Sequence, residues 1–261
     1  MIYIICPFFN EEKNVSKFLS SFPIREDLFF ILINDGSKDE TLSEINKYVA
    51  ENLISHKIIN HKENVGLERA ILSGLINSYE ENSYYAVMDT DLQDPPELLF
   101  NNLSKLENND LINFSRKDRK YDTYIKRKTA KIYYNLMSLS INKKKAKSLD
   151  MGNFKLFRSS VILKIINKKK YKRSFRIDVL NNSKNPIYIF YSRGDRIEGT
   201  TNYNYRKLII EALKSTQLSF KLIILFFFYL LKLPIVILIA ILLFIIKLEK
   251  SKYYKEPTKI I

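Results

Sequence analysis

Short apolar runs alternate with helical patterns through the first 115 residues. Five runs have the length and composition of buried strands, at 2–6, 28–34, 57–60, 84–88 and 110–114. Between them, apolar side chains recur at the spacing of one helix face, within 15–22, 42–49 and 67–75. This alternation predicts right-handed βαβ units, and therefore an α/β fold with a mostly parallel sheet.

The pattern loosens after residue 115. We expect a basic amphipathic helix over 122–140, a strand at 153–157, a helix at 159–166, a strand at 186–191 and an amphipathic helix near 205–220. We therefore divide the chain into a catalytic domain over 1–203, an amphipathic juxtamembrane helix over 204–221, a membrane segment over 222–246 and a basic tail over 247–261.

Residues 222–246 form a long apolar run, in which 21 of 25 side chains are Leu, Ile, Val or Phe. As a helix this run extends about 37 Å, which exceeds a hydrocarbon core of about 30 Å. A single charged side chain, Lys232, costs less than the apolar residues contribute. The run is therefore expected to enter a membrane, either as one span or as a hairpin that turns back near Pro234. A buried core helix is the alternative.

Charge is divided unevenly along the chain. Residues 1–115 carry 9 Lys and Arg against 19 Asp and Glu, whereas residues 116–261 carry 34 against 9. An acidic half suits a metal, and a basic half suits lipid headgroups or phosphates. No nucleic-acid-binding motif is visible, so nucleic acid is not an expected partner. The sole cysteine, Cys6, is consistent with a reducing compartment, and no signal peptide is recognised.

Polar clusters follow three of the predicted strands, at 7–12, 35–37 and 89–94. Ligands of parallel α/β sheets bind beyond the carboxyl ends of the strands, so we expect these clusters to form one site. Asp89 and Asp91 follow a buried strand, and two such carboxylates can hold a divalent cation that neutralises a diphosphate. An ordinary surface turn uses the same residues.

Four segments carry a family resemblance: Pro7-Phe8-Phe9-Asn10-Glu11-Glu12, residues 34–41 (NDGSKDET), Asn64-Val65-Gly66 and residues 89–97 (DTDLQDPPE). In order and spacing they resemble the family 2 glycosyltransferases of GT-A fold, above all the dolichol-phosphate mannosyltransferase-like polyprenyl-phosphate sugar transferases. The resemblance covers about residues 1–220. It implies a Rossmann-like catalytic domain.

The resemblance also implies roles for individual residues. Those expected at the nucleotide-sugar are Pro7, Asn10, Glu11, Asp35, Asp89, Asp91, Gln93 and Arg116. Of these, Asp89 and Asp91 are expected to hold Mg²⁺ or Mn²⁺ on the donor diphosphate. Asp39 is expected either to shape the nucleoside pocket or to cap a helix. Asp94, at the end of the same motif as Asp89 and Asp91, could equally be the cap of a helix that starts at Pro95-Pro96.

The acceptor side of the resemblance lies in the basic half. Arg193 and Arg196 match an Arg-x-x-Arg segment that can grip an anionic phosphate, although a solvated loop would look the same. Residues 151–156 (MGNFKL) stand where relatives usually show Gly-Asp-Phe-Arg-Leu. Asn153 therefore replaces an acceptor-side aspartate, and Lys155 replaces an arginine. Asparagine cannot act as a general base.

These features predict a membrane-anchored, metal-dependent transferase on the cytoplasmic face of the inner membrane. It would move a sugar from a UDP- or GDP-sugar to polyprenyl (undecaprenyl) phosphate with inversion, and Asp91, Asn153, Arg193 and Arg196 are its candidate catalytic residues. One alternative is transfer to a sugar hydroxyl of a polysaccharide or lipid-linked oligosaccharide. Another is a membrane module that binds nucleotide-sugar without turnover. A homo-oligomer is compatible with the sequence.

Overall fold

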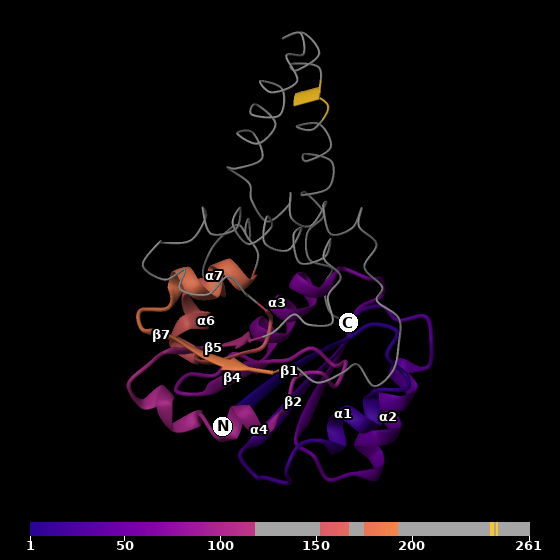
Figure 1. Ribbon diagram of the computed structural model, residues 1–261. Coiled ribbons are helices and arrows are strands. Elements are labelled where there is room, and N and C mark those ends of the chain that lie inside the picture. Colours follow the sequence, from indigo (N-terminus) through magenta and orange to yellow (C-terminus); the bar gives the residue numbers. More distant parts are fainter. Residues whose placement is uncertain (118–151, 167–174, 193–240, 243, 245–261) are drawn as a thin grey trace.

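The computed structural model describes residues 1–117, 152–166 and 175–192, together with residues 241, 242 and 244 (Figure 1). The predicted helices at 122–140 and 205–220, almost all of the 222–246 run, Arg193 and Arg196 lie outside the described residues. In the part that is described, no helix is long and apolar enough to cross a membrane.

The described strands form one seven-stranded sheet in the order β3-β2-β1-β4-β6-β5-β7. Their bounds are Ile2–Phe8 (β1), Leu28–Asn34 (β2), His56–Asn60 (β3), Tyr84–Val87 (β4), Leu111–Arg116 (β5), Lys155–Arg158 (β6) and Pro186–Tyr191 (β7). All neighbouring pairs are parallel except those of β6, which runs antiparallel to both β4 and β5. The prediction of a mostly parallel sheet is therefore confirmed.

Reversal of β6 has a consequence for the site. Because β6 runs against its neighbours, its first residue, Lys155, pairs with Val87 at the carboxyl end of β4 and with Asn113 in the middle of β5. The segment that leads into β6 therefore enters at the sheet edge where ligands of parallel sheets bind. Sequence periodicity predicts the strand here but not its direction.

Helices cover both faces of the sheet (Figure 1). One face carries α3 (Leu67–Asn77), α6 (Ser159–Ile166) and α7 (Phe175–Asn182), and the other carries α1 (Val15–Ser20), α2 (Thr41–Glu51), α4 (Glu97–Phe100) and the 3-10 helix η1 (Leu103–Glu107). Each face has its own cluster of buried apolar side chains. Successive strand residues alternate between the two, as Ile4 and Ile5 do.

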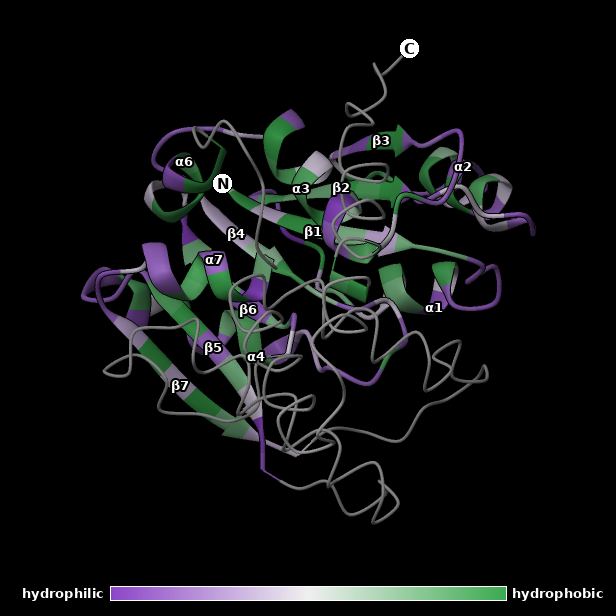
Figure 2. Cartoon of the chain, turned by 90° about the horizontal axis from the view of Figure 1, so that it is seen from above, coloured by the Kyte–Doolittle hydropathy of each residue, from purple (hydrophilic) through white to green (hydrophobic). Residues whose placement is uncertain are grey.

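The central strands read as unbroken apolar runs because both of their faces are covered, and Figure 2 shows this hydrophobic character along β1 and β2. Helix α3 packs especially close to β2. A Cβ on Gly74 would stand 2.6 Å from Cδ1 of Ile33, so a larger residue at this position would force the Ile33 side chain to move.

Every predicted strand before residue 115 is present, with ends shifted by at most two residues. The predicted strands at 153–157 and 186–191 and the helix at 159–166 are also present. Helix α4 begins at the helix start expected at Pro95-Pro96, whereas η1 and α7 are missing from the prediction. The 3-10 helix η1 is only five residues long, and the apolar residues of α7 show no one-sided pattern that periodicity could detect.

Candidate functional site

The ends of β1, β2 and β4 meet at one edge of the sheet, as the clusters of polar residues predict. The Thr90 hydroxyl, just after β4, donates to the carbonyl of Pro7 at 3.2 Å. The backbone N–H of Asp35, just after β2, donates to the carbonyl of Phe8 at 2.9 Å. These bonds join the three polar segments into one surface.

The loop after β1 is bound to the loop after β2. The backbone N–H of Asn10 donates to the Ser37 hydroxyl at 3.0 Å, and the side-chain oxygen of Asn10 accepts from the backbone N–H of Lys38 at 2.9 Å. Next to it, the backbone N–H of Glu11 donates to Oγ1 of Thr41 at 2.8 Å. Asn10 takes a φ of 55°, a left-handed conformation that asparagine tolerates better than most residues. The two loops therefore support each other.

Asp39 links the same two loops and supports the start of α2. Its Oδ1 accepts from the backbone N–H and the hydroxyl of Thr41, at 3.1 Å and 2.6 Å, and its Oδ2 accepts from the backbone N–H of Glu12 at 3.3 Å. Asp39 therefore holds the first residue of α2, as a cap would, and its expected part in the nucleoside pocket stays a prediction.

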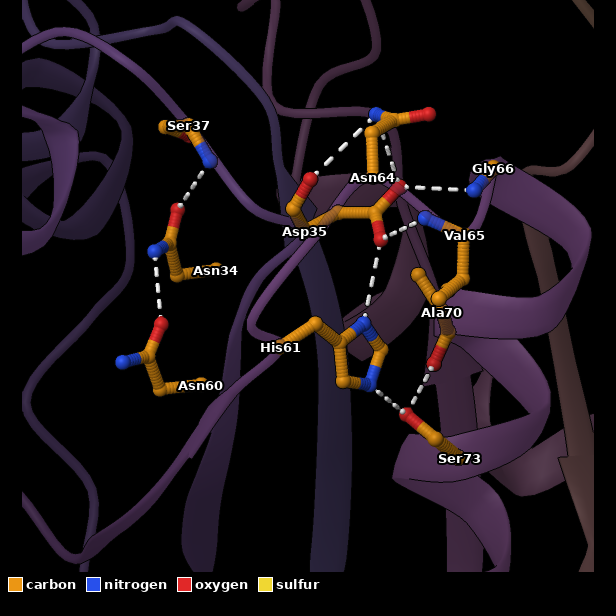
Figure 3. Close-up of polar contacts among 10 residues, drawn as sticks. All are labelled: Asn34, Asp35, Ser37, Asn60, His61, Asn64, Val65, Gly66, Ala70 and Ser73. Atoms are coloured by element: carbon orange, nitrogen blue, oxygen red, sulfur yellow. Dashed lines mark hydrogen bonds and ion pairs between the residues drawn. The ribbon is translucent and has the colours of Figure 1, made fainter. Parts of the chain in front are cut away.

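Asp35 is the centre of the polar network in Figure 3, and its side chain is 3% exposed. Oδ1 accepts from the backbone N–H of Val65 at 2.9 Å and faces Nδ1 of His61 at 3.0 Å. Oδ2 accepts from the backbone N–H of Gly66 at 3.0 Å and from the side-chain amide of Asn64 at 3.1 Å. The carboxylate thus holds the Asn64–Gly66 turn against the end of β2. Its expected contact with the nucleoside stays a prediction.

His61 and Ser73 complete this network, and sequence reasoning missed both. Nε2 of His61 lies 2.9 Å from the Ser73 hydroxyl, which donates to the carbonyl of Ala70 within α3 (Figure 3). Because Nδ1 faces the Asp35 carboxylate, that nitrogen carries a proton in this arrangement. Histidine is rare in this chain, which has two, so a histidine directly after the third strand was a sequence signal that could have pointed to His61 as a site residue.

Two loops cross at Gly36. A Cβ at this position would stand 2.4 Å from the carbonyl carbon of Glu63, and the φ of Gly36 is +65°. Beside it, the buried side chain of Asn34 accepts from the backbone N–H of Ser37 at 3.2 Å and donates to Asn60 at 2.8 Å (Figure 3). The loop that carries Asp35 is therefore fixed from both sides.

The Asp89–Gln93 loop follows β4 directly. Asp91 is 8% exposed, and its Oδ1 accepts from the backbone N–H of Gln93 at 3.3 Å. Between them, Leu92 takes a φ of 60°, which is strained for a residue with a large side chain. The loop is thus a tight, strained turn that carries both Asp89 and Asp91 at the sheet edge.

Asn153 lies at the edge of the sheet that carries Asp89 and Asp91, and its expected role on the acceptor side stays a prediction. Its side chain is buried, and Nδ2 donates to Oδ1 of Asp89 at 3.0 Å. Asn153 therefore contacts one of the two candidate metal ligands directly.

Lys155 is buried within the sheet beside this site. Its Nζ donates to the side-chain oxygen of Asn113 and to the carbonyl of Gly152, the latter at 2.6 Å. A buried ammonium requires such partners because burial removes its water. The contact with Gly152 fixes the segment immediately before Asn153.

Arg116 ends β5 and pairs in register with Tyr191 of β7, at the edge where the other site residues lie. The Tyr191 hydroxyl donates to the buried carboxylate of Asp94. Asp94 therefore contacts β7, and its expected role as a cap before Pro95-Pro96 stays a prediction.

Asp89 and Asp91 fit one mode of metal binding. The described residues contain no group of three or more His, Cys, Asp or Glu side chains arranged around a metal position. Mg²⁺, however, is commonly held by one or two carboxylates together with substrate phosphates. Two carboxylates at the end of β4 suit this shared mode, in which the donor completes the coordination.

A separate open hollow of about 470 Å³ lies between the start of α2 and the end of β3. Its lining includes Ser37, Asp39 and His61, but neither Asp89 nor Asp91. The residues expected at the nucleoside, Pro7, Asn10, Glu11 and Asp35, are also absent from its lining. This hollow therefore adjoins the loop of Asp35 without including the two carboxylates expected at the metal.

The sequence pattern of glycosyl transferase family 2 matches residues 3–166, which is more than half of the chain. The chain belongs to glycosyl transferase family 2. The prediction from the four motifs is thus confirmed, and the family match includes Asp35, Asp89, Asp91 and Asn153.

Two relatives illustrate the family membership. A prophage bactoprenol glucosyl transferase homolog of Escherichia coli is 32% identical over 216 residues, which are 79% of this chain and 68% of that protein. An uncharacterized glycosyltransferase of Synechocystis sp. is 30% identical over 212 residues, which are 78% of this chain but 65% of that protein. The chain thus covers slightly less than two thirds of the Synechocystis protein.

Solved structures share the fold. Glucosyl-3-phosphoglycerate synthase from Mycobacterium tuberculosis, in complex with Mg²⁺ and uridine diphosphate, has a TM-score of 0.57 at 14% identity, covering 81% of this chain and 75% of that one. S. aureus TarS in complex with UDP-GlcNAc has a TM-score of 0.52 at 15% identity, covering 86% and 65%. This family 2 member therefore shares the fold of these two proteins.

Proposed function

We propose that this family 2 protein transfers a sugar from a nucleotide-sugar to a polyprenyl phosphate at a membrane surface. The observation that carries the proposal is the pair Asp89 and Asp91 at the carboxyl end of β4, in a chain related to bactoprenol glucosyl transferases. The structures that share its fold include complexes with uridine diphosphate and Mg²⁺ or Mn²⁺.

The donor side is built from loops that the protein has already ordered. The bonds of Asn10 to Ser37 and Lys38, and those of Asp35 to Val65 and Gly66, leave little freedom to lose when a nucleoside binds. Asp89 and Asp91 would hold Mg²⁺ or Mn²⁺, which supplies positive charge to the departing diphosphate. Uracil and guanine both remain candidates for the base.

The acceptor side suits an oxygen that is already anionic. Asn153 cannot take a proton, and its amide nitrogen donates to Asp89. A phosphate oxygen of a lipid needs no general base, whereas a sugar hydroxyl does. The bond from the anomeric carbon to the diphosphate breaks as the bond to the lipid phosphate forms, and the nucleoside diphosphate leaves with the bonding pair. One such displacement inverts the anomeric carbon.

The membrane attachment rests on the sequence. Residues 222–246 supply an apolar run of sufficient length, and the basic half would attract anionic lipids by about 1 kcal/mol for each charge near the surface. Arg193 and Arg196 would contact the lipid phosphate by charge-assisted hydrogen bonds. In this proposal the catalytic domain faces the cytoplasm, where nucleotide-sugars are made.

The test is a panel of labelled UDP- and GDP-sugars incubated with membranes that contain the protein and undecaprenyl phosphate. The expected result is label in the lipid extract, with none from membranes that carry Asp91→Asn. Label in a polysaccharide or oligosaccharide would instead assign a hydroxyl acceptor. Donor binding without any transferred label would indicate the non-catalytic module.

A further inference from the structure

Arg176, in the first turn of α7, contacts the side of Asn153 that faces away from Asp89. Its Nε donates to Oδ1 of Asn153 at 2.7 Å, while Nδ2 of Asn153 donates to Oδ1 of Asp89 at 3.0 Å. The side chains therefore form a continuous line from α7 to the end of β4. Arg176 is far in sequence from the family's four motifs.

The chemistry of the partners decides which way the Asn153 amide points. A guanidinium has only donors, so it must face the amide oxygen, and a carboxylate has only acceptors, so it must face the amide nitrogen. Rotating the amide by half a turn would set donor against donor at Arg176 and acceptor against acceptor at Asp89. Both contacts thus favour a single orientation.

Arg176 is itself held by α3. Nε of Arg176 lies 3.5 Å from Oε1 of Glu68, and the other carboxylate oxygen of Glu68 accepts from the backbone N–H of Phe175 at 2.6 Å. Glu68 thus caps the start of α7 and fixes the residue that orients Asn153. On the other side, Lys155 holds the carbonyl of Gly152.

We propose that Arg176 is a positioning residue for the metal-binding carboxylate Asp89, acting through the Asn153 amide that it locks in the donating orientation. The proposal rests on the proposed function for the metal role of Asp89. It accounts for the asparagine at 153, because an ionised aspartate there could not donate to Asp89. Partners that orient metal ligands commonly contribute 10- to 100-fold in metal affinity or activity.

The test measures Mn²⁺ binding to the full chain in detergent by the electron paramagnetic resonance of free Mn²⁺. Titrations are run with Mn²⁺ alone, with UDP and with GDP. Asn153→Ala and Arg176→Ala should each weaken Mn²⁺ binding by about 10-fold. Arg176→Lys should restore most of the affinity, since an ammonium can also donate to the amide oxygen.

The double variant Asn153→Ala/Arg176→Ala distinguishes positioning from a merely structural role. If Arg176 acts through Asn153, the double variant binds Mn²⁺ as the single Asn153→Ala variant does. Additive losses, or full affinity in Asn153→Ala, would overturn the proposal. Arg158→Gln is the matched control, because Arg158 contacts the carbonyls of Leu106 and Glu107 away from Asp89 and should leave Mn²⁺ affinity unchanged.

Two further measurements keep the outcome interpretable. Thermal unfolding of each variant shows whether it is folded, and if Arg176→Ala does not fold, the comparison of Asn153→Ala with Arg176→Lys still tests the line of contacts. Because Mn²⁺ binding needs no acceptor, a wrong lipid acceptor leaves this result intact. Loss of Mn²⁺ binding in Asp91→Asn, with no effect at Asn153, would refute the positioning role alone.

Discussion

Glu68, in the first turn of α3, accepts a hydrogen bond from the backbone N–H of Phe175 at the start of α7. Just before this turn, the backbone N–H of Gly66 donates to Asp35. The start of α3 therefore contacts the loop expected at the nucleoside and, through Arg176 and Asn153, the loop that carries Asp89. The start of α3 thus connects the two halves of the site through hydrogen bonds.

Asp91→Asn should abolish transfer while leaving the fold intact. A neutral amide is a poor ligand for a hard cation, so the departing diphosphate would lose its counter-charge. Chelation by EDTA should stop transfer by the unaltered protein, and added Mg²⁺ or Mn²⁺ should restore it. Transfer of label to lipid is the measurement, and full activity in EDTA would refute the metal assignment.

Asp35→Asn should lower the free energy of unfolding by about 1–3 kcal/mol and weaken nucleotide binding. An amide keeps one oxygen and replaces the other with an NH2 group, so the backbone N–H of either Val65 or Gly66 loses its acceptor and is left buried and unsatisfied. Chemical denaturation and nucleotide titration measure the two effects.

The control for Asp35→Asn is Asp110→Asn, just before β5. The Asp110 carboxylate also accepts two backbone N–H groups, from Lys184 and Asn185, but at the opposite edge of the sheet. Because these two N–H groups are exposed and can turn to water, Asp110→Asn should lose less stability and leave nucleotide binding unchanged. Equal loss of binding in both variants would assign the effect to general destabilisation rather than to the loop of Asp35.

Much of the donor half of the site follows from the sequence, since β4 and the carboxylates after it are local in the chain. The contact of His61 with Asp35 and the contact of Arg176 with Asn153 do not follow from the sequence, because the two partners lie 26 and 23 residues apart. The reversed direction of β6 is likewise set by tertiary packing. Periodicity records burial but not strand direction, so the place of Asn153 beside Asp89 was not predictable.

Gly36→Ala should destabilise the fold by on the order of 3 kcal/mol, from a left-handed φ and from overlap with the Glu63 backbone. Gly152→Ala is the control, because the nearest atom to its Cβ lies 4.0 Å away. Thermal unfolding compares the two. A Gly36→Ala protein as stable as Gly152→Ala would show that the two loops do not cross as closely as described.

Tyr3→Phe should make the free energy of unfolding fall less steeply as the pH rises above about 10. Burial, and then a hydrogen bond to the Glu80 carboxylate, raise the pKa of Tyr3 to about 12. Above pH of about 10 the unfolded phenol loses its proton while the folded one keeps it, so stability falls as pH rises toward 12.

Denaturant unfolding between pH 9 and 12, roughly the range that the phenol titration spans, measures this slope. Tyr48→Phe is the control, since the Tyr48 hydroxyl contacts Ser20 at an exposed position. If Tyr3→Phe and the unaltered protein lose stability in parallel through this range, the raised pKa of Tyr3 has no part in the alkaline transition.

The topology of the 222–246 run can be read with one introduced cysteine. Cys6 is fully buried, and burial raises the pKa of its thiol well above the usual range, so it should not react while the protein is folded. Ser251→Cys can therefore be labelled with Cys6 left in place, which avoids a polar substitution in the core. The unaltered protein is the control, and its lack of labelling checks that Cys6 is protected.

With the catalytic domain in the cytoplasm, the Ser251→Cys variant distinguishes the two membrane arrangements. Labelling of the introduced thiol by an impermeant reagent outside intact cells indicates a single span, because the tail then lies on the far side of the membrane from the catalytic domain. Protection until lysis indicates a hairpin at Pro234. Recovery of the full chain in the soluble fraction without detergent would contradict membrane attachment and remove the main support for a lipid-phosphate acceptor.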